Sequence, residues 1–280
     1  AAMVHLNQNH AVSVQRTAAL VQDFFGLAVS EAAVIKATQG AADMLEPTVQ
    51  EIGLAIVRAR TVNADESGMR VANQLHWLHV LATDTLTWMA LHPKRGFEAF
   101  ESLGLLLQFR GVLVHDGWLA YKALECEHAL CNQHHLRELT NLLEEQGQAW
   151  AGDIIHVLTH ANHLDNLNCA EGRTPDYASE AYQSEVQELR DLYEAILAHA
   201  QTEHPIAAST GKRGRVKQST ATNLIRRLVT YSDEVWRFMT QPNVPFTNNL
   251  AEQTVRMPKV KQKVSGCFRT TRGGDDYCTI

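Results

Sequence analysis

The sequence has little of several features that would assign it to a class at once. Its 280 residues contain five cysteines at irregular spacing, which gives no disulfide framework and suits a reducing compartment. No apolar run approaches the roughly 20 residues that a membrane-spanning helix needs. The amino end does not read as a signal peptide. We therefore expect a cytoplasmic protein with no membrane partner.

Two kinds of catalytic motif are also missing. The sequence has no glycine-rich loop of the type that cradles phosphates, and Ser265-Gly266-Cys267 has no base at motif spacing. A hydrophobic content of 45% is enough for a sizeable core, in one large domain or two smaller ones. Ala1 and Ala2 precede Met3, which is not how a natural start reads, so a cloned fragment and a natural truncation both stay open.

Positive charge is scarce overall and concentrated locally. The net charge of -6 argues against a uniformly basic nucleic-acid binder. Residues 207–228, however, contain six Lys or Arg and no acid, and residues 253–272 contain six more. Two basic patches on an acidic protein suit local contact with a polyanion, although two solvated cationic faces would explain the charge equally well.

The apolar pattern predicts five strands. Runs rich in Val, Thr, Leu and Trp occupy residues 61–71, 74–82, 85–91, 111–118 and 128–132. A turn at Ala72-Asn73 joins the first two as an antiparallel hairpin. The fourth run ends on Asp116-Gly117, as a buried strand does where it meets a loop at the carboxyl edge of a sheet.

Helices are expected between and after these strands. They are predicted in residues 10–58 with Ser30 as a cap, in 96–104 and 118–125, in 134–200 with an interruption near 165–176, and in 221–240. Residues 203–220 read as a basic, glycine-containing loop. This order predicts an α/β protein of the RNase H-like kind, with a mixed five-stranded sheet flanked by helices.

Three carboxylates suggest a function. Asp65 lies in the first strand and Asp116 at the end of the fourth, and these strands are neighbours in an RNase H-like sheet. Glu252, on a late helix, can complete the set. Carboxylate oxygens are the ligands that Mg²⁺ prefers, and two such ions about 4 Å apart can promote phosphodiester cleavage. Plainer roles stay open, with Asp65 facing solvent beside Glu66 and Asp116 in a simple turn.

Glu252 itself has two interpretations. Asn249 can cap a helix, and Glu252 three residues later would complete a capping box. Pro258 should end or kink that helix near Met257. Alternatively, Glu252 is a metal ligand beside a track of bases that starts at Arg256 and holds phosphates.

The residues that flank Asp116 are expected to be structural. His115 should point to the other face of the sheet. Trp118 is most simply a core residue, and stacking on a nucleic-acid base is the weaker alternative.

A cluster of possible zinc ligands follows the fifth strand. Cys126, Cys131, His134 and His135 lie within ten residues. Cys131 falls on a predicted strand, however, and adjacent histidines rarely both reach one ion. We favour a packed thiol with a hydrogen-bonded histidine.

Several stretches match one family. They are "ADESGMRV" (64–71), "LHWLHVLATDT" (75–85), "FRGVLVHDGWLAY" (109–121), "ALCNQHHLREL" (129–139) and "VPFTNNLAEQTVRMPKVKQKVSGCFRT" (244–270). In these stretches the chain resembles the catalytic part of the insertion sequence 66 transposase family, and the last is highly specific. The resemblance implies a DDE transposase with Asp65, Asp116 and Glu252 as the catalytic triad that holds two Mg²⁺ or Mn²⁺ ions. Cys131, His134 and Arg137 resemble a family motif, which implies that they support the active site.

The resemblance also implies a reaction and partners. Water would cut a strand at the transposon end, and the freed 3′-hydroxyl would attack target DNA. The chain would act as a homo-oligomer on DNA at the bacterial nucleoid. Phosphates are expected to contact Arg256, Lys259, Lys261, Lys263 and Arg269, together with Lys212, Arg213, Arg215 and Lys217 of the basic loop.

These inferences predict four parts and leave three functions open. The parts are 1–58, a helical connector left from an amino-terminal DNA-binding region; 59–139, the first part of the core; 140–235, a helical insertion before the third acid; and 236–280, core completion with the Glu252 helix and a basic tail. The residues alone allow a transposase, a nuclease of the same fold without strand transfer, or an inactive remnant that only binds DNA. The retained acids and the long carboxyl-terminal motif favour the transposase.

Overall fold

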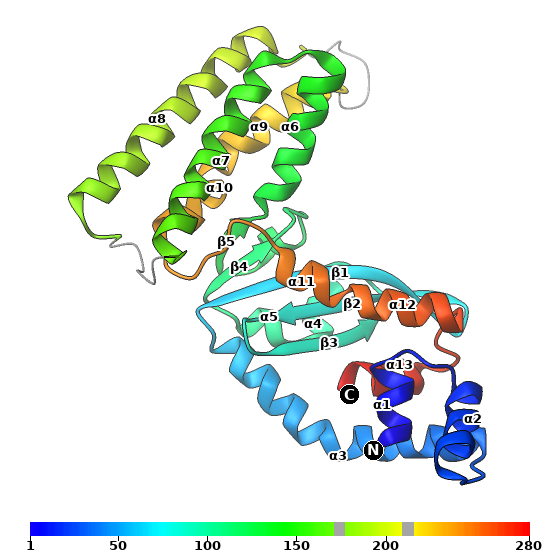
Figure 1. Cartoon of the computed structure of the whole chain (residues 1–280). Coiled ribbons are helices and arrows are strands. Elements are labelled where there is room, and N and C mark those ends of the chain that lie inside the picture. Colours follow the sequence, from blue (N-terminus) through cyan, green and yellow to red (C-terminus); the bar gives the residue numbers. More distant parts are fainter. Residues whose placement is uncertain (171–176, 209–215) are drawn as a thin grey trace. The chain divides into compact units, whose positions relative to one another are not determined.

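The chain divides into two units, and each is described by itself. The computed structural model describes residues 1–170, 177–208 and 216–280 (Figure 1). The sheet unit comprises Ala1–Glu127 and Asn248–Ile280, and the helical unit comprises His128–Thr247. Among the described residues, no helix is both long and apolar enough to cross a membrane.

The predicted mixed sheet of five strands is confirmed. The strands are β1 (Thr61–Val71), β2 (Gln74–Ala82), β3 (Thr87–His92), β4 (Val112–His115) and β5 (Glu127–Leu130). Their order is β3-β2-β1-β4-β5. The first three strands form an antiparallel meander, whereas β1, β4 and β5 run parallel, as expected for an RNase H-like sheet. The register pairs Val114, near the carboxyl end of β4, with Asn63 in the first half of β1.

The first hairpin has the predicted turn. Ala72 and Asn73 have φ values of 47° and 63°. Two positive φ values are typical of a type I′ turn, whose twist matches the twist of the two strands. A later segment stabilises this turn, because the Phe268 N–H donates to the Arg70 carbonyl at 2.9 Å and the Ala72 N–H donates to the Phe268 carbonyl at 2.8 Å.

Helices cover both faces of the sheet. Side chains alternate along β1, so this strand contributes apolar residues to both faces. On one face, Val62 and Ala64 pack into a core with helices α3 (Glu31–Val57), α4 (Phe97–Leu103) and α5 (Leu105–Gln108). On the other face, Met69 packs with residues of helix α11 (Asn249–Thr254), which helix α12 (Arg256–Ser265) follows. Figure 1 shows α11 and α12 in orange, along the sheet.

The helix predicted at 118–125 is wrong. The structure has only a 3₁₀ turn, Tyr121–Ala123. Trp118, Tyr121 and Leu124 all pack against the same core cluster. A repeat of three residues per turn brings residues at this spacing onto one side, which an α-helix would not do as closely.

The helical region predicted at 10–58 is two helices. Helix α2 (Val14–Phe25) ends at Gly26, whose φ of 65° is the left-handed conformation common after a helix. The predicted cap of the second helix is confirmed, since Ser30 Oγ accepts a hydrogen bond from the Ala33 N–H at 3.1 Å. Helices α1 (Ala2–Gln8) and α13 (Thr271–Thr279) complete the sheet unit.

The helical unit is built from five helices within its described residues. They are α6 (Asn132–Gln146), α7 (Ala149–Ala170), α8 (Glu180–Glu203), α9 (Thr220–Thr230) and α10 (Ser232–Thr240). Tyr193 and Trp236 are fully buried in an edge-to-face contact, and the Tyr193 hydroxyl donates to the Leu228 carbonyl at 3.1 Å. The predicted insertion, residues 140–235, lies inside this unit, and its role as a separate domain stays a prediction.

Candidate active site

Asp65 lies on the sheet face that α11 covers. It pairs with Val80 across the β1–β2 ladder, and Val80 packs with Ala251 and Val255. Residues that are directly opposite in a ladder share a face of the sheet. One carboxylate oxygen of Asp65 accepts a hydrogen bond from the Glu66 N–H at 2.9 Å, which restrains its direction.

Asp116 is the first residue after β4 and is exposed. Its Oδ1 accepts a hydrogen bond from the Trp118 N–H at 2.9 Å. Between them, Gly117 has a φ of 88° and donates its N–H to His115 Nδ1 at 3.0 Å. The Asp116 carboxylate therefore lies in a short loop whose shape is held by these two hydrogen bonds.

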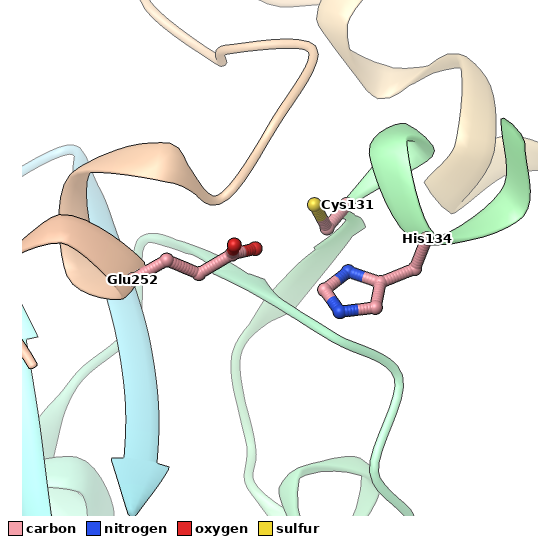
Figure 2. Close-up of side chains that lie close together, drawn as sticks. All are labelled: Cys131, His134 and Glu252. Carbon is pink, nitrogen blue, oxygen red and sulfur yellow. The ribbon is translucent and has the colours of Figure 1, made fainter. Parts of the chain in front are cut away.

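Glu252 lies in the first turn of α11, and its position depends on a buried pair of amides. Asn63 Nδ2 donates to Asn248 Oδ1 at 2.9 Å, and Asn248 Nδ2 donates to the Ala64 carbonyl at 2.8 Å. This pair attaches the start of α11 to β1 close to Asp65. Figure 2 shows the Glu252 carboxylate extending from the helix.

The expected capping box at Glu252 is wrong. The N-cap is Asn248 rather than Asn249, and its side chain makes no capping hydrogen bond. The Asn248 amide is instead bonded to β1, because a buried amide must satisfy both its donor and its acceptor.

Asp116 and Glu252 lie close enough to Asp65 to act on its pKa. Burial and the negative charge of Glu66 raise the pKa of Asp65 to about 7, against an ordinary value of 3.8. The charges of Asp116 and Glu252 add to the rise, and the hydrogen bond from the Glu66 N–H opposes it. Residues from β1, from the loop after β4 and from α11 are thus brought together within the sheet unit.

This donor set fits a divalent cation. All three side chains offer carboxylate oxygens, which are the hard ligands that Mg²⁺ and Mn²⁺ take. Burial and the neighbouring acids disfavour the charged form of Asp65, and a bound cation would offset that cost. Asp65, Asp116 and Glu252 are the residues that would hold it.

A comparison with protein families shows the family of the chain. The model for the "Transposase IS66 family" matches residues 1–276, nearly the whole chain. The chain belongs to the IS66 transposase family. Its members are DDE transposases, and the three acids occupy three separate segments of the matched region. No curated protein matches the chain.

Sequence reasoning missed a cluster of side chains behind the two aspartates of this transposase. Glu66 does not face solvent, because its side chain is 1% exposed and pairs with Arg95 at 2.5 Å. Tyr121 donates its hydroxyl to the other carboxylate oxygen of Glu66. Adjacent residues in a strand point to opposite faces of the sheet, so the sequence could have predicted that Glu66 lies on the face opposite to that of Asp65. Nothing in the local sequence identifies Arg95, which lies in the loop after β3.

Some basic residues in and after α12 are exposed, and others donate hydrogen bonds to backbone carbonyls. Arg256 and Lys263 are exposed, as is Arg269 after the helix. Lys259 donates to the Gly68 carbonyl. Lys261 is 6% exposed, donates to the Asn7 carbonyl and has a pKa lowered to about 8 by burial. Lys261 is therefore not part of the exposed basic surface expected from the sequence, because it is enclosed between α12 and the last turn of α1.

The break in this segment lies earlier than predicted. Helix α11 ends at Thr254 and α12 begins at Arg256, so the helix breaks at Val255 rather than near Met257. Pro258 sits in the first turn of α12, where a missing N–H costs no helical hydrogen bond.

The basic loop of the helical unit is mostly outside the described residues. Lys217 is exposed. Lys212, Arg213 and Arg215 lie outside the described part of the chain.

The four possible zinc ligands are divided between the two units, with Cys126 in the sheet unit and the other three in the helical unit. Cys126 packs against the core of the sheet unit, and burial raises the pKa of its thiol to about 11. In the helical unit, Cys131 is buried at the start of α6, with His134 in the first turn (Figure 2). His135 Nδ1 lies 3.1 Å from Asn132 Oδ1, and Arg137 is exposed. A supporting role for Cys131, His134 and Arg137 stays a prediction.

Proposed function

We propose that this IS66 family chain catalyses metal-dependent DNA strand cleavage and strand transfer, with Asp65, Asp116 and Glu252 as its catalytic residues. The observation that supports this most strongly is the gathering of carboxylates from three distant segments around Asp65, whose pKa is raised to about 7 by burial and by Glu66, with smaller contributions from Asp116 and Glu252. A fold seldom gathers acids in this way unless a ligand compensates their charge.

The side chains of the site have separate tasks in this proposal. Divalent cations, when bound, supply the charge that activates an attacking oxygen and stabilises a leaving oxygen. Asp65 and Asp116 each receive a backbone N–H on one oxygen, which orients the carboxylate and leaves its other oxygen to bind a cation. Glu252 completes the set from α11, held through the Asn63–Asn248 pair. Phosphoryl transfer depends chiefly on positioning and charge, so a rigid set of acids is what the reaction needs.

DNA phosphates would be held by the exposed bases that follow Glu252. Changing Arg256, Lys263 and Arg269 together to Ala should weaken binding to DNA of any sequence by about tenfold or more near 0.15 M salt, and should lower the salt slope by about 2 to 3, because up to three phosphate contacts are lost. Fluorescence anisotropy over a salt series measures both quantities.

The matched control removes the same charge elsewhere in the sheet unit. Lys36, Arg58 and Arg60 are exposed in or just after α3. Their triple change to Ala should leave the salt slope close to that of the wild type. Equal losses in both triple variants would mean that overall charge, rather than this surface, governs binding.

A strand-transfer assay tests the proposal. The chain is incubated with Mn²⁺ or Mg²⁺, a pre-cut DNA end that carries a free 3′-hydroxyl, and target DNA. Joined products are the expected result. Cleavage without joining would favour the nuclease alternative, and DNA binding with neither product would favour the inactive remnant. Titration of the products against protein concentration tests the proposed homo-oligomer on DNA.

A further inference from the structure

Glu66 is an acid beside the proposed site that cannot take part in it as a ligand. It pairs with His79 across the β1–β2 ladder, on the face opposite to that of Asp65. One carboxylate oxygen accepts hydrogen bonds from Arg95 Nε at 2.8 Å and Nη2 at 2.5 Å. The other accepts the Tyr121 hydroxyl. With both oxygens occupied by protein donors, Glu66 serves to hold Arg95.

Arg95 is held on its other sides by two tryptophans. The guanidinium carbon lies 4.9 Å from the centre of the Trp77 ring and 4.1 Å from that of the Trp118 ring. These distances are typical of cation–π contacts. The side chain is only 35% exposed. Because its charge is already matched by Glu66, Arg95 is poorly suited to binding a phosphate.

Two of the residues that contact Arg95, Glu66 and Trp118, each also orient one of the two aspartates. Glu66 donates its backbone N–H to the Asp65 carboxylate and presents its side chain to Arg95. Trp118 donates its backbone N–H to the Asp116 carboxylate and presents its ring to Arg95. A single guanidinium thus connects the two residues whose N–H groups orient the aspartates.

We infer that Arg95 is a positioning residue that fixes the spacing of Asp65 and Asp116 for a shared divalent cation. Resting on the proposed function, this inference adds a role for a side chain that touches neither substrate nor ion. Without Arg95, Trp118 would lose its contact with the guanidinium that binds Glu66 of β1, and Glu66 would become a buried carboxylate with one partner fewer.

Whether the loss of Arg95 weakens or strengthens Mn²⁺ binding distinguishes a positioning role from a purely electrostatic one. Arg95 is a cation, so its removal should strengthen the binding of Mn²⁺ if only charge mattered. Positioning predicts the opposite. Outer partners of metal ligands typically contribute about 10- to 100-fold in metal affinity. Arg95→Met should therefore weaken Mn²⁺ binding at least about tenfold, and Arg95→Lys, which keeps the charge but not the two-pronged bond, should also weaken it.

Isothermal titration of MnCl₂ into the full chain without DNA measures this directly. The control is Arg110→Met, because Arg110 forms a surface ion pair with Glu125 at 3.5 Å and is 58% exposed. Its affinity for Mn²⁺ should match that of the wild type. If Arg95→Met does not fold, Tyr121→Phe decides, since it removes one donor to Glu66 and should weaken binding measurably.

The outcomes separate the two proposals. If the wild type binds Mn²⁺, Asp116→Asn does not, and a folded Arg95→Met binds as tightly as the wild type or more tightly, the positioning role is overturned while the metal site stands. For an Arg95→Met that does not fold, unchanged affinity in Tyr121→Phe has the same meaning. If the wild type binds no Mn²⁺, or Asp116→Asn binds it equally well, the proposed site and the positioning role both fail.

Discussion

Asp116→Asn is expected to abolish strand cleavage and strand transfer while leaving DNA binding within about twofold of the wild type. The substitution keeps an oxygen that can accept the Trp118 N–H, so the loop after β4 should keep its shape. It removes one negative charge from the proposed cation ligands. Metal-assisted stabilisation of the transition state is worth several kcal/mol, and a loss of about 4 kcal/mol corresponds to a rate about a thousandfold lower.

The measurement compares cleavage and transfer of labelled DNA ends with binding of the same DNA in Ca²⁺. Asp84→Asn is the matched control, because Asp84 is exposed in the turn between β2 and β3. That variant should retain full activity. An Asp116→Asn protein that cleaves within tenfold of the wild-type rate would remove Asp116 from the catalytic set.

Asp65→Asn is expected to stabilise the protein at neutral pH in the absence of metal. The pKa of Asp65 is raised from 3.8 to about 7, so the folded state holds a proton that the unfolded chain has already released. The wild type therefore loses stability as the pH rises from about 4 to about 7, and the penalty is complete above that range. After a discount for the part of Asp65 that solvent reaches, the gain from Asp65→Asn at pH 8 should be about 2 kcal/mol.

Thermal unfolding at pH 4 and pH 8, with EDTA present, tests this prediction. The variant should melt about 5 °C above the wild type at pH 8 and at nearly the same temperature at pH 4. Addition of Mn²⁺ should raise the melting temperature of the wild type at pH 8 more than that of the variant, because bound metal favours the folded state. A variant that melts below the wild type at pH 8 would show that the acids do not strain the fold.

The sequence by itself determined the hairpin and the strand order. The bounds of the first two strands and the turn at Ala72-Asn73 agree with the structure, because alternation of side chains and positive φ values depend on neighbouring residues. The sequence also placed Asp65 in a strand and Asp116 at a strand end, and the long carboxyl-terminal motif indicated the family. The choice of these acids as catalytic residues rests on that resemblance and stays a proposal.

Only the tertiary structure decided which side chains those acids meet. The partner of Glu66, Arg95, is 29 residues away, that of Asn63 is 185 residues away and that of Lys261 is 254 residues away. Local patterns wrongly predicted a capping box at Asn249 and a helix at 118–125. At Asn248, an enclosed amide must find a partner wherever the fold supplies one, and the free energy of leaving it unpaired exceeds that of a helix cap. At 118–125, the packing of Trp118, Tyr121 and Leu124 against one core cluster favours a 3₁₀ turn over the predicted helix.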